Sequence, residues 1–153
     1  MSYHNGSVWP HDTALCAAGM AHYGDKRAAA RLLSLLFRAS AHFDMRLPEL
    51  YCGFQRRTGE PPVGYPVACL PQAWSSGAVF MLLAACLGVT IDGSSGIIHV
   101  DRPELPAELN RLVVERLAVG TATVDLVFER VGDRVTAAPL GPHSQSVEMI
   151  VRA

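Results

Sequence analysis

The sequence predicts a mainly α-helical protein with a β tail, because its hydrophobic periodicity changes near residue 90. Before that position apolar residues recur at helical spacing, and after it they alternate with polar residues as in half-buried strands. A chain of 153 residues has room for about one domain. We therefore expect helical hairpins over residues 1–90 and a small antiparallel β unit over residues 91–153.

Three helices are predicted in the first part. The first covers residues 10–24 and the second covers residues 26–42 behind a cap at Asp25. The third covers residues 71–88 and begins at Pro71, a residue favoured in the first turn. It is apolar nearly all round, so protein should cover both its faces. The apolar positions of the first two helices are Ala14, Leu15, Ala17, Ala18, Met20, Ala21, Ala29, Leu32, Leu33, Leu36 and Phe37.

A long segment, residues 43–70, separates the second and third helices. Its prolines and glycines exclude regular structure throughout, and connections of this length in compact domains are usually functional or disordered. Tyr51, Phe54 and Tyr65 are interleaved with these residues, whereas a disordered linker would lack such aromatics. We therefore expect an ordered loop that packs against a site.

The β tail is predicted from alternation and turns. Residues 112–119 lead through Gly120 into residues 121–129, where apolar and polar positions alternate. Gly132 and Asp133 predict the turn to a third strand near residues 134–138. A last strand is indicated by the alternating apolar residues Val147, Met149 and Val151.

Composition excludes several classes of function. The chain is 50% hydrophobic and 18% charged with a mean hydropathy of +0.20, which argues against disorder. A net charge of -1 argues against a nucleic-acid partner. We expect a cytoplasmic protein without a membrane span, because no secretory signal is visible and the apolar stretch from Gly77 to Val89 is short of the ~20 residues that a span needs.

No cofactor or metal is expected either. The four cysteines, Cys16, Cys52, Cys69 and Cys86, have no metal-ligand spacing and should stay reduced in the cytoplasm. A glycine-rich phosphate loop and an HExxH motif are both missing from the sequence.

Three clusters combine aromatic and polar residues, at positions 4–12, 46–54 and 65–74. Aromatic rings can stack on sugar faces, polar side chains can bind hydroxyls, and a carboxylate can act as general base. Structural roles remain open for the same residues. Asn5, Ser7 and Asp12 would then cap a helix. His4 and His11 would be buried and hydrogen-bonded, and the two tryptophans, Trp9 and Trp74, would pack in the interior. Glu49 would lie on the surface of a short helix.

The clusters also carry a family resemblance. Residues 4–12, HNGSVWPHD, resemble a signature of bacterial glycogen debranching enzyme-like proteins, the amylo-α-1,6-glucosidase family. RLPELYCGF at 46–54, GEPP at 59–62, and YPVAC with PQAW between 65 and 74 are similar to further blocks of that family. The resemblance covers residues 3–77 in order and becomes looser after residue 90.

The resemblance implies a glycoside hydrolase of the six-hairpin type, which inverts configuration as it cleaves α-glucosidic bonds, α-1,6 bonds in particular. It implies that the chain is the C-terminal part of an (α/α)6 barrel followed by the small β unit. Glu49, in its Pro-Glu-Leu context, corresponds to the general base. The positions that would contact substrate or shape the site are His4, Trp9, His11, Asp12, Tyr65, Gln72 and Trp74.

The family's general acid lies upstream, in a part that this sequence does not include. Inverting hydrolysis needs two carboxylates about 6.5–9.5 Å apart, so we expect a C-terminal fragment with little or no activity by itself. Its partners would be an α-glucan or oligosaccharide and the missing N-terminal part of the barrel. Three helices, one of them apolar all round, also leave surfaces uncovered. The alternatives are a carbohydrate-binding or oligomerising remnant without chemistry and a non-functional fragment that aggregates.

Overall fold

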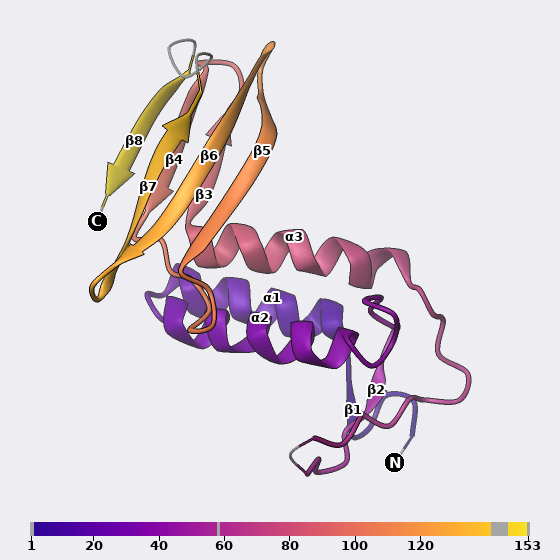
Figure 1. Ribbon diagram of the computed structural model, residues 1–153. Helices are drawn as coiled ribbons and strands as arrows, with labels where there is room; N and C mark the ends of the chain where they lie inside the picture. The colour runs from indigo at the N-terminus through magenta and orange to yellow at the C-terminus, as the bar shows by residue number, and fades with distance from the viewer. Residues whose placement is uncertain (1, 58, 142–146, 153) are drawn as a thin grey trace. The chain divides into compact units, whose positions relative to one another are not determined.

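The computed structural model describes residues 2–57, 59–141 and 147–152 (Figure 1). In this part the chain forms three helices and eight strands in three sheets, with about as many residues in strands as in helices. The expectation of a mainly α protein, and of the C-terminal part of an (α/α)6 barrel, is therefore wrong. The chain divides into two compact units, Met1–Leu83 and Ala84–Ala153.

The first unit contains the predicted hairpin of α1 (Pro10–His22) and α2 (Lys26–Ser40). Gly24, with φ 99°, makes the turn between them, and the Asp25 carboxylate accepts a 2.9 Å hydrogen bond from the backbone N–H of Ala28. Both helices and the cap were predicted correctly. The buried stripe is built largely from small residues, which let the two helices approach closely: Ala14, Ala17, Ala21, Ala29, Ala30 and Ala39 are all buried. Leu15, Met20 and Phe37, which the sequence assigned to the apolar faces, are exposed instead.

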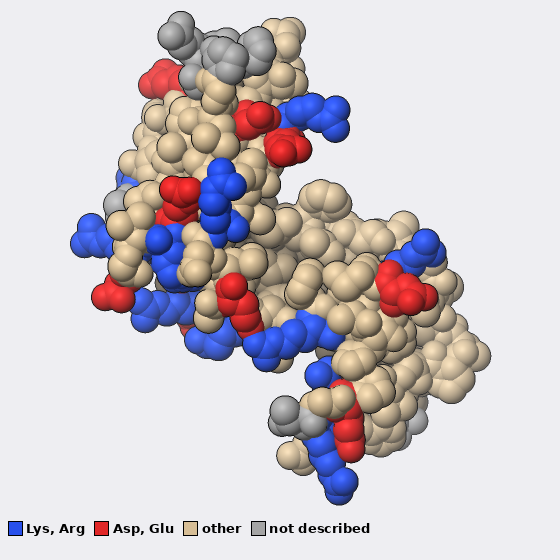
Figure 2. All heavy atoms as spheres, viewed as in Figure 1, with Lys and Arg blue, Asp and Glu red and all other residues tan. Residues whose placement is uncertain are grey.

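The third helix, α3 (Ala73–Leu87), begins two residues later than Pro71. Ala78, Leu82 and Cys86 are buried at a spacing of four residues and therefore define one packed face. The expectation that protein covers both faces is wrong, because Trp74 and Phe80 are 46% and 73% exposed. Figure 2 shows an uncharged surface along most of this helix, in agreement with a sequence that has no charged residue there.

The long segment between α2 and α3 is irregular over most of its length, but it is packed. Within it, β2 (Tyr51–Cys52) pairs in antiparallel fashion with β1 (Ser7–Val8), as Figure 1 shows. An isolated bridge joins Tyr51 to Gly64 and folds the loop back on itself. Residues 47–51 are all buried.

The second unit holds two three-stranded sheets. One has the order β3 (Val89–Asp92), β4 (Ile97–Asp101), β8 (Glu148–Arg152), and the other has the order β5 (Arg111–Val119), β6 (Ala122–Val131), β7 (Arg134–Leu140). The strands β5 to β8 were predicted, whereas β3 and β4 were not. The expectation of an antiparallel unit is wrong for one pair, because β4 and β8 run parallel. Their shared core contains Leu87, Ile98, Val100, Leu105, Val119, Val124, Leu126, Phe128 and Val135.

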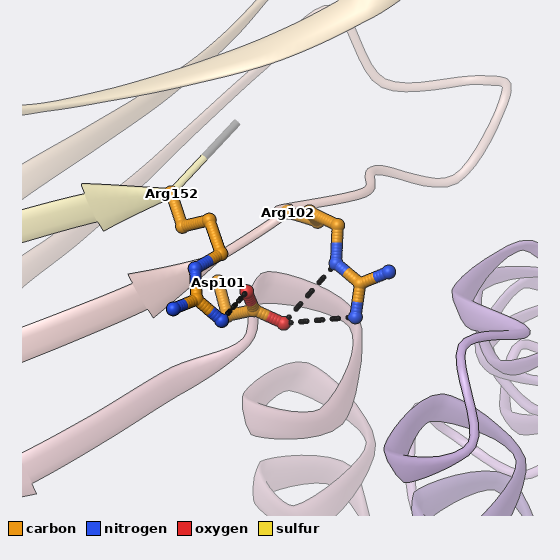
Figure 3. Close-up of polar contacts among 3 residues, drawn as sticks. All are labelled: Asp101, Arg102 and Arg152. Atoms are coloured by element: carbon orange, nitrogen blue, oxygen red, sulfur yellow. Dashed lines mark hydrogen bonds and ion pairs between the residues drawn. The ribbon is translucent and has the colours of Figure 1, made fainter.

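Charged side chains join the ends of β4 and β8, where Asp101 is in register with Arg152. The Asp101 carboxylate lies 3.2 Å from Nη2 of Arg102 and 3.9 Å from Nη1 of Arg152 (Figure 3). The backbone N–H of Arg102 also donates a 2.6 Å hydrogen bond to the carbonyl of Arg152. These contacts hold the parallel pair together at the surface, where each ion pair contributes little by itself.

None of the helices that the structure describes is both long and apolar enough to cross a membrane.

Candidate functional site

The first unit brings the three sequence clusters together. The pairing of β1 with β2 joins residues 4–12 to residues 46–54, and it is extended by a 2.8 Å hydrogen bond from the backbone N–H of Gly53 to the carbonyl of Gly6. The third cluster joins the second through a 2.9 Å bond from the backbone N–H of Glu49 to the carbonyl of Cys69. Backbone contacts between distant segments therefore build the site.

Glu49 is the centre of this junction. It lies in an irregular segment, not in a helix, and its side chain is buried, with the residue only 7% exposed. The hydroxyl of Tyr3 donates a 2.5 Å hydrogen bond to Oε1, and the backbone N–H of Cys69 donates a 3.3 Å bond to Oε2. The alternative of a surface glutamate in a short helix is thus excluded. Each of its two carboxylate oxygens therefore accepts a hydrogen bond.

The same contact fixes the proton on Tyr3. The hydrogen bond to Glu49 is the main cause that raises the pKa of Tyr3 to about 12, with burial and the charge of Glu49 adding to it. The phenol therefore stays protonated at neutral pH and can act only as a donor to the carboxylate. Tyr3 was not among the predicted site residues, although it directly precedes the HNGSVWPHD cluster and could have been included with it.

Two stacked pairs of rings form the aromatic part of the site. His4 lies parallel to Trp9 with their centroids 5.8 Å apart, and His11 lies parallel to Trp74 at 5.7 Å. The two tryptophans meet edge to face at 6.1 Å, so the pairs form one continuous cluster.

A groove of about 710 Å³ opens beside these rings. Its walls include five of the predicted binding residues: His4, Trp9, His11, Asp12 and Trp74. The carboxylate of Asp12 lies 3.6 Å from Nδ1 of His11, and both side chains reach solvent. The groove therefore offers aromatic faces together with hydrogen-bonding groups, which is the combination that a neutral polyhydroxylated ligand requires.

The remaining predicted residues are placed differently. Tyr65 is half-buried and packs its ring edge-on against Tyr3, with centroids 5.6 Å apart. The side chain of Gln72 accepts a 2.9 Å hydrogen bond from the backbone N–H of Ala73, so it is engaged at the start of α3. Glu49 is not among the residues that line the groove.

Helix capping does not account for the first cluster. The residue at the N-cap of α1 is Trp9, and no side chain caps that end through a hydrogen bond. The hydroxyl of Ser7 donates instead to the carbonyl of Ser2 at 3.1 Å. Asp12 lies in the first turn of α1, where a negative charge is favourable.

Metal ligation has no support in the part of the chain that the structure describes, where no three His, Cys, Asp or Glu residues gather closely enough to hold an ion. None of the four cysteines forms a disulfide with another. Chemically, the groove can stack against a neutral ligand and form hydrogen bonds with it, and the buried carboxylate of Glu49 is held by Tyr3 beside the groove's rings.

Comparisons with known proteins give this chain no family: no protein-family model matches it, and no curated protein is significantly similar.

Proposed function

We propose that the first unit is part of a glycoside hydrolase that acts on α-glucosides, with Glu49 as the general base of an inverting reaction. The observation that carries the proposal is the buried Glu49 carboxylate, which Tyr3 holds at 2.5 Å while Tyr3 also contacts the aromatic groove. The resemblance of residues 3–77 to amylo-α-1,6-glucosidases supplies the substrate class. The α-1,6 linkage and a cytoplasmic location, in which the free cysteines stay reduced, belong to the same proposal.

The groove supports the substrate class through its chemistry. Trp9 and Trp74 present rings on which the apolar faces of a glucose residue can stack. His4, His11 and Asp12 supply donors and acceptors for its hydroxyl groups. Neither the aromatic rings nor these hydrogen-bonding groups require a charged ligand, which agrees with a neutral glucan.

The chemistry assigned to Glu49 is that of a base. Its carboxylate would take a proton from water as that water attacks the anomeric carbon, and the glucosyl bond to the leaving group would break on the opposite face. A natural glucoside also needs an acid to protonate the leaving oxygen, about 6.5–9.5 Å from the base. This proposal assigns that acid to no residue of the 153-residue sequence.

A substrate whose leaving group needs no proton tests the base without the acid. α-D-Glucosyl fluoride releases fluoride ion directly, so the chain should convert it to β-glucose, which anomer-resolved proton NMR detects. Glu49→Gln should lower this rate by about 10²-fold or more, since general bases contribute on that scale. Glu60→Gln, a change at an exposed glutamate of the same loop, is the matched control and should leave the rate unchanged. Equal rates for the unaltered chain and the Glu49→Gln variant would remove Glu49 from the mechanism.

A second candidate is carbohydrate binding without chemistry. It is favoured by one observation, that Glu49 is buried and does not line the groove. In that case maltooligosaccharides should quench the fluorescence of Trp9 and Trp74 equally in the unaltered chain and in the Glu49→Gln variant. Hydrolysis of glucosyl fluoride would then not exceed the spontaneous rate.

A further inference from the structure

Tyr3 contacts both parts of the site. Its hydroxyl donates to Oε1 of Glu49, while the edge of its ring meets Trp9 at a centroid distance of 5.0 Å and His4 at 4.9 Å. Trp9 and His4 line the groove, whereas Glu49 does not. Tyr3 therefore connects the residues that line the groove to the carboxylate of Glu49.

The surroundings of Tyr3 restrict how its phenol can move. Its ring is nearly perpendicular to those of His4 and Trp9, at 87° and 88°, and Tyr65 meets it at 76°. Edge-to-face contacts of this kind are directional, so three of them fix the plane of the ring. The hydroxyl then has one strong acceptor, Glu49, and this hydrogen bond is charge-assisted.

The carboxylate is held unevenly. Its Oε1 receives the short bond from Tyr3, and its Oε2 receives only the 3.3 Å bond from the backbone of Cys69. Tyr3 therefore provides the shorter of the two hydrogen bonds that orient this carboxylate.

We propose that Tyr3 is a positioning residue, which holds Oε1 of Glu49 and links the orientation of that carboxylate to occupation of the groove at Trp9. This inference rests on the proposed function, because it takes the occupant to be a saccharide. Tyr3 itself touches neither the water nor the reacting carbon in this scheme.

The test is a double-mutant cycle on the full chain, with maltotetraose binding measured by calorimetry. Tyr3→Phe keeps the ring and removes the hydroxyl, and we expect it to weaken binding about tenfold, the scale of one hydrogen bond to a charged group. Combined with Glu49→Gln it should add less than it does alone, because that change already replaces the acceptor of the Tyr3 hydroxyl with a weaker, neutral one. Tyr23→Phe is the matched control: Tyr23 is 90% exposed, and losing its hydroxyl should leave binding unchanged.

A second measurement needs no ligand and separates positioning from mere packing. The Tyr3 phenol should titrate near 12 in the unaltered chain and shift toward the ordinary 10.0 in the Glu49→Gln variant, as followed by NMR of labelled tyrosine. A phenol that titrates identically in both overturns the inference while leaving the proposed function intact. The inference is also overturned if Tyr3→Phe and Glu49→Gln lower the binding affinity independently of each other. Absence of any saccharide binding by the unaltered chain overturns the proposed function, and the positioning role with it.

Discussion

The backbone N–H of Gly53 donates a 2.8 Å hydrogen bond to the carbonyl oxygen of Gly6, 47 residues earlier in the sequence. The approach is so close that a Cβ atom at position 53 would collide with that oxygen. Glycine is therefore required at 53 by the neighbouring backbone, while Gly6 itself has a φ of 81° that favours glycine. This contact extends the pairing of β1 with β2 and holds two of the three site segments together.

Replacing Gly53 with alanine should separate these segments. We expect Gly53→Ala to destabilise the chain by about 1–3 kcal/mol, since overpacking against rigid backbone has costs on that scale, and to abolish saccharide binding. Thermal unfolding followed by tryptophan fluorescence measures the first effect. Gly19→Ala, in α1 with open space around the added methyl group, is the control and should be neutral or stabilising by up to about 1 kcal/mol. Equal melting temperatures for the two variants would contradict the assigned contact.

Removing the ring of Trp9 should weaken ligand binding more than it changes the fold. Trp9 is half-buried, stacks on His4 and lines the groove. We expect Trp9→Ala to lower the affinity for maltotetraose about tenfold, because a stacked aromatic ring contributes roughly 0.5–1.5 kcal/mol in addition to the area that it buries. Phe54→Ala, at an exposed ring that does not line this groove, serves as the control. Equal losses of affinity in both variants would show that the groove is not the binding site.

The free energy of unfolding of the second unit at low pH should depend on the carboxyl group of Asp92. The hydroxyl of Ser94 donates a 2.6 Å bond to Asp92, and together with Ser95 it lowers the pKa of Asp92 from 3.8 to about 2. Because the folded pKa lies below the unfolded one, the stabilisation is fully present above pH 3.8 and is lost as the pH falls toward 2.

Ser94→Ala removes the largest cause of this shift, so the pKa of Asp92 should rise toward 3.8 in a carboxyl NMR titration. Ser76→Ala, at an exposed serine of α3, should leave it unchanged. A low pKa that survives in the Ser94→Ala variant would assign the effect to Ser95 and the backbone donors.

The core of the second unit should depend on Phe128. This side chain is fully buried on β6 and belongs to the cluster that joins both sheets. Phe128→Ala should cost about 3–5 kcal/mol in the free energy of unfolding, the usual range for a buried phenylalanine, as measured by urea denaturation. Phe80→Ala, at a ring that is 73% exposed, should stay within about 0.5 kcal/mol. A small loss at position 128 would show that the two sheets do not share a packed core.

The local sequence was sufficient to predict the longer helices and strands. The hairpin of α1 and α2 and the strands β5 to β7 were predicted because each spans enough residues to show its own period and has its own turn at Gly24, Gly120 or Gly132. The Asp25 cap depends only on a residue three positions away.

The fold class was predicted wrongly because short strands carry no measurable period. The strands β1 and β2 have two residues each, and β3 and β4 have four and five. The strands β1 and β2 pair across distant segments, and β4 pairs in parallel with the distant β8 as well as with its neighbour β3. Counting periodic segments therefore overstated the helical share.

For the site, residue type alone left structural roles open, and the family resemblance of residues 3–77 selected Glu49 and the rings of the groove. Only the tertiary structure decided that Tyr3 holds Glu49 and that Glu49 does not line the groove. Tyr3 and Glu49 are 46 residues apart, and they meet through backbone pairing that no local pattern encodes.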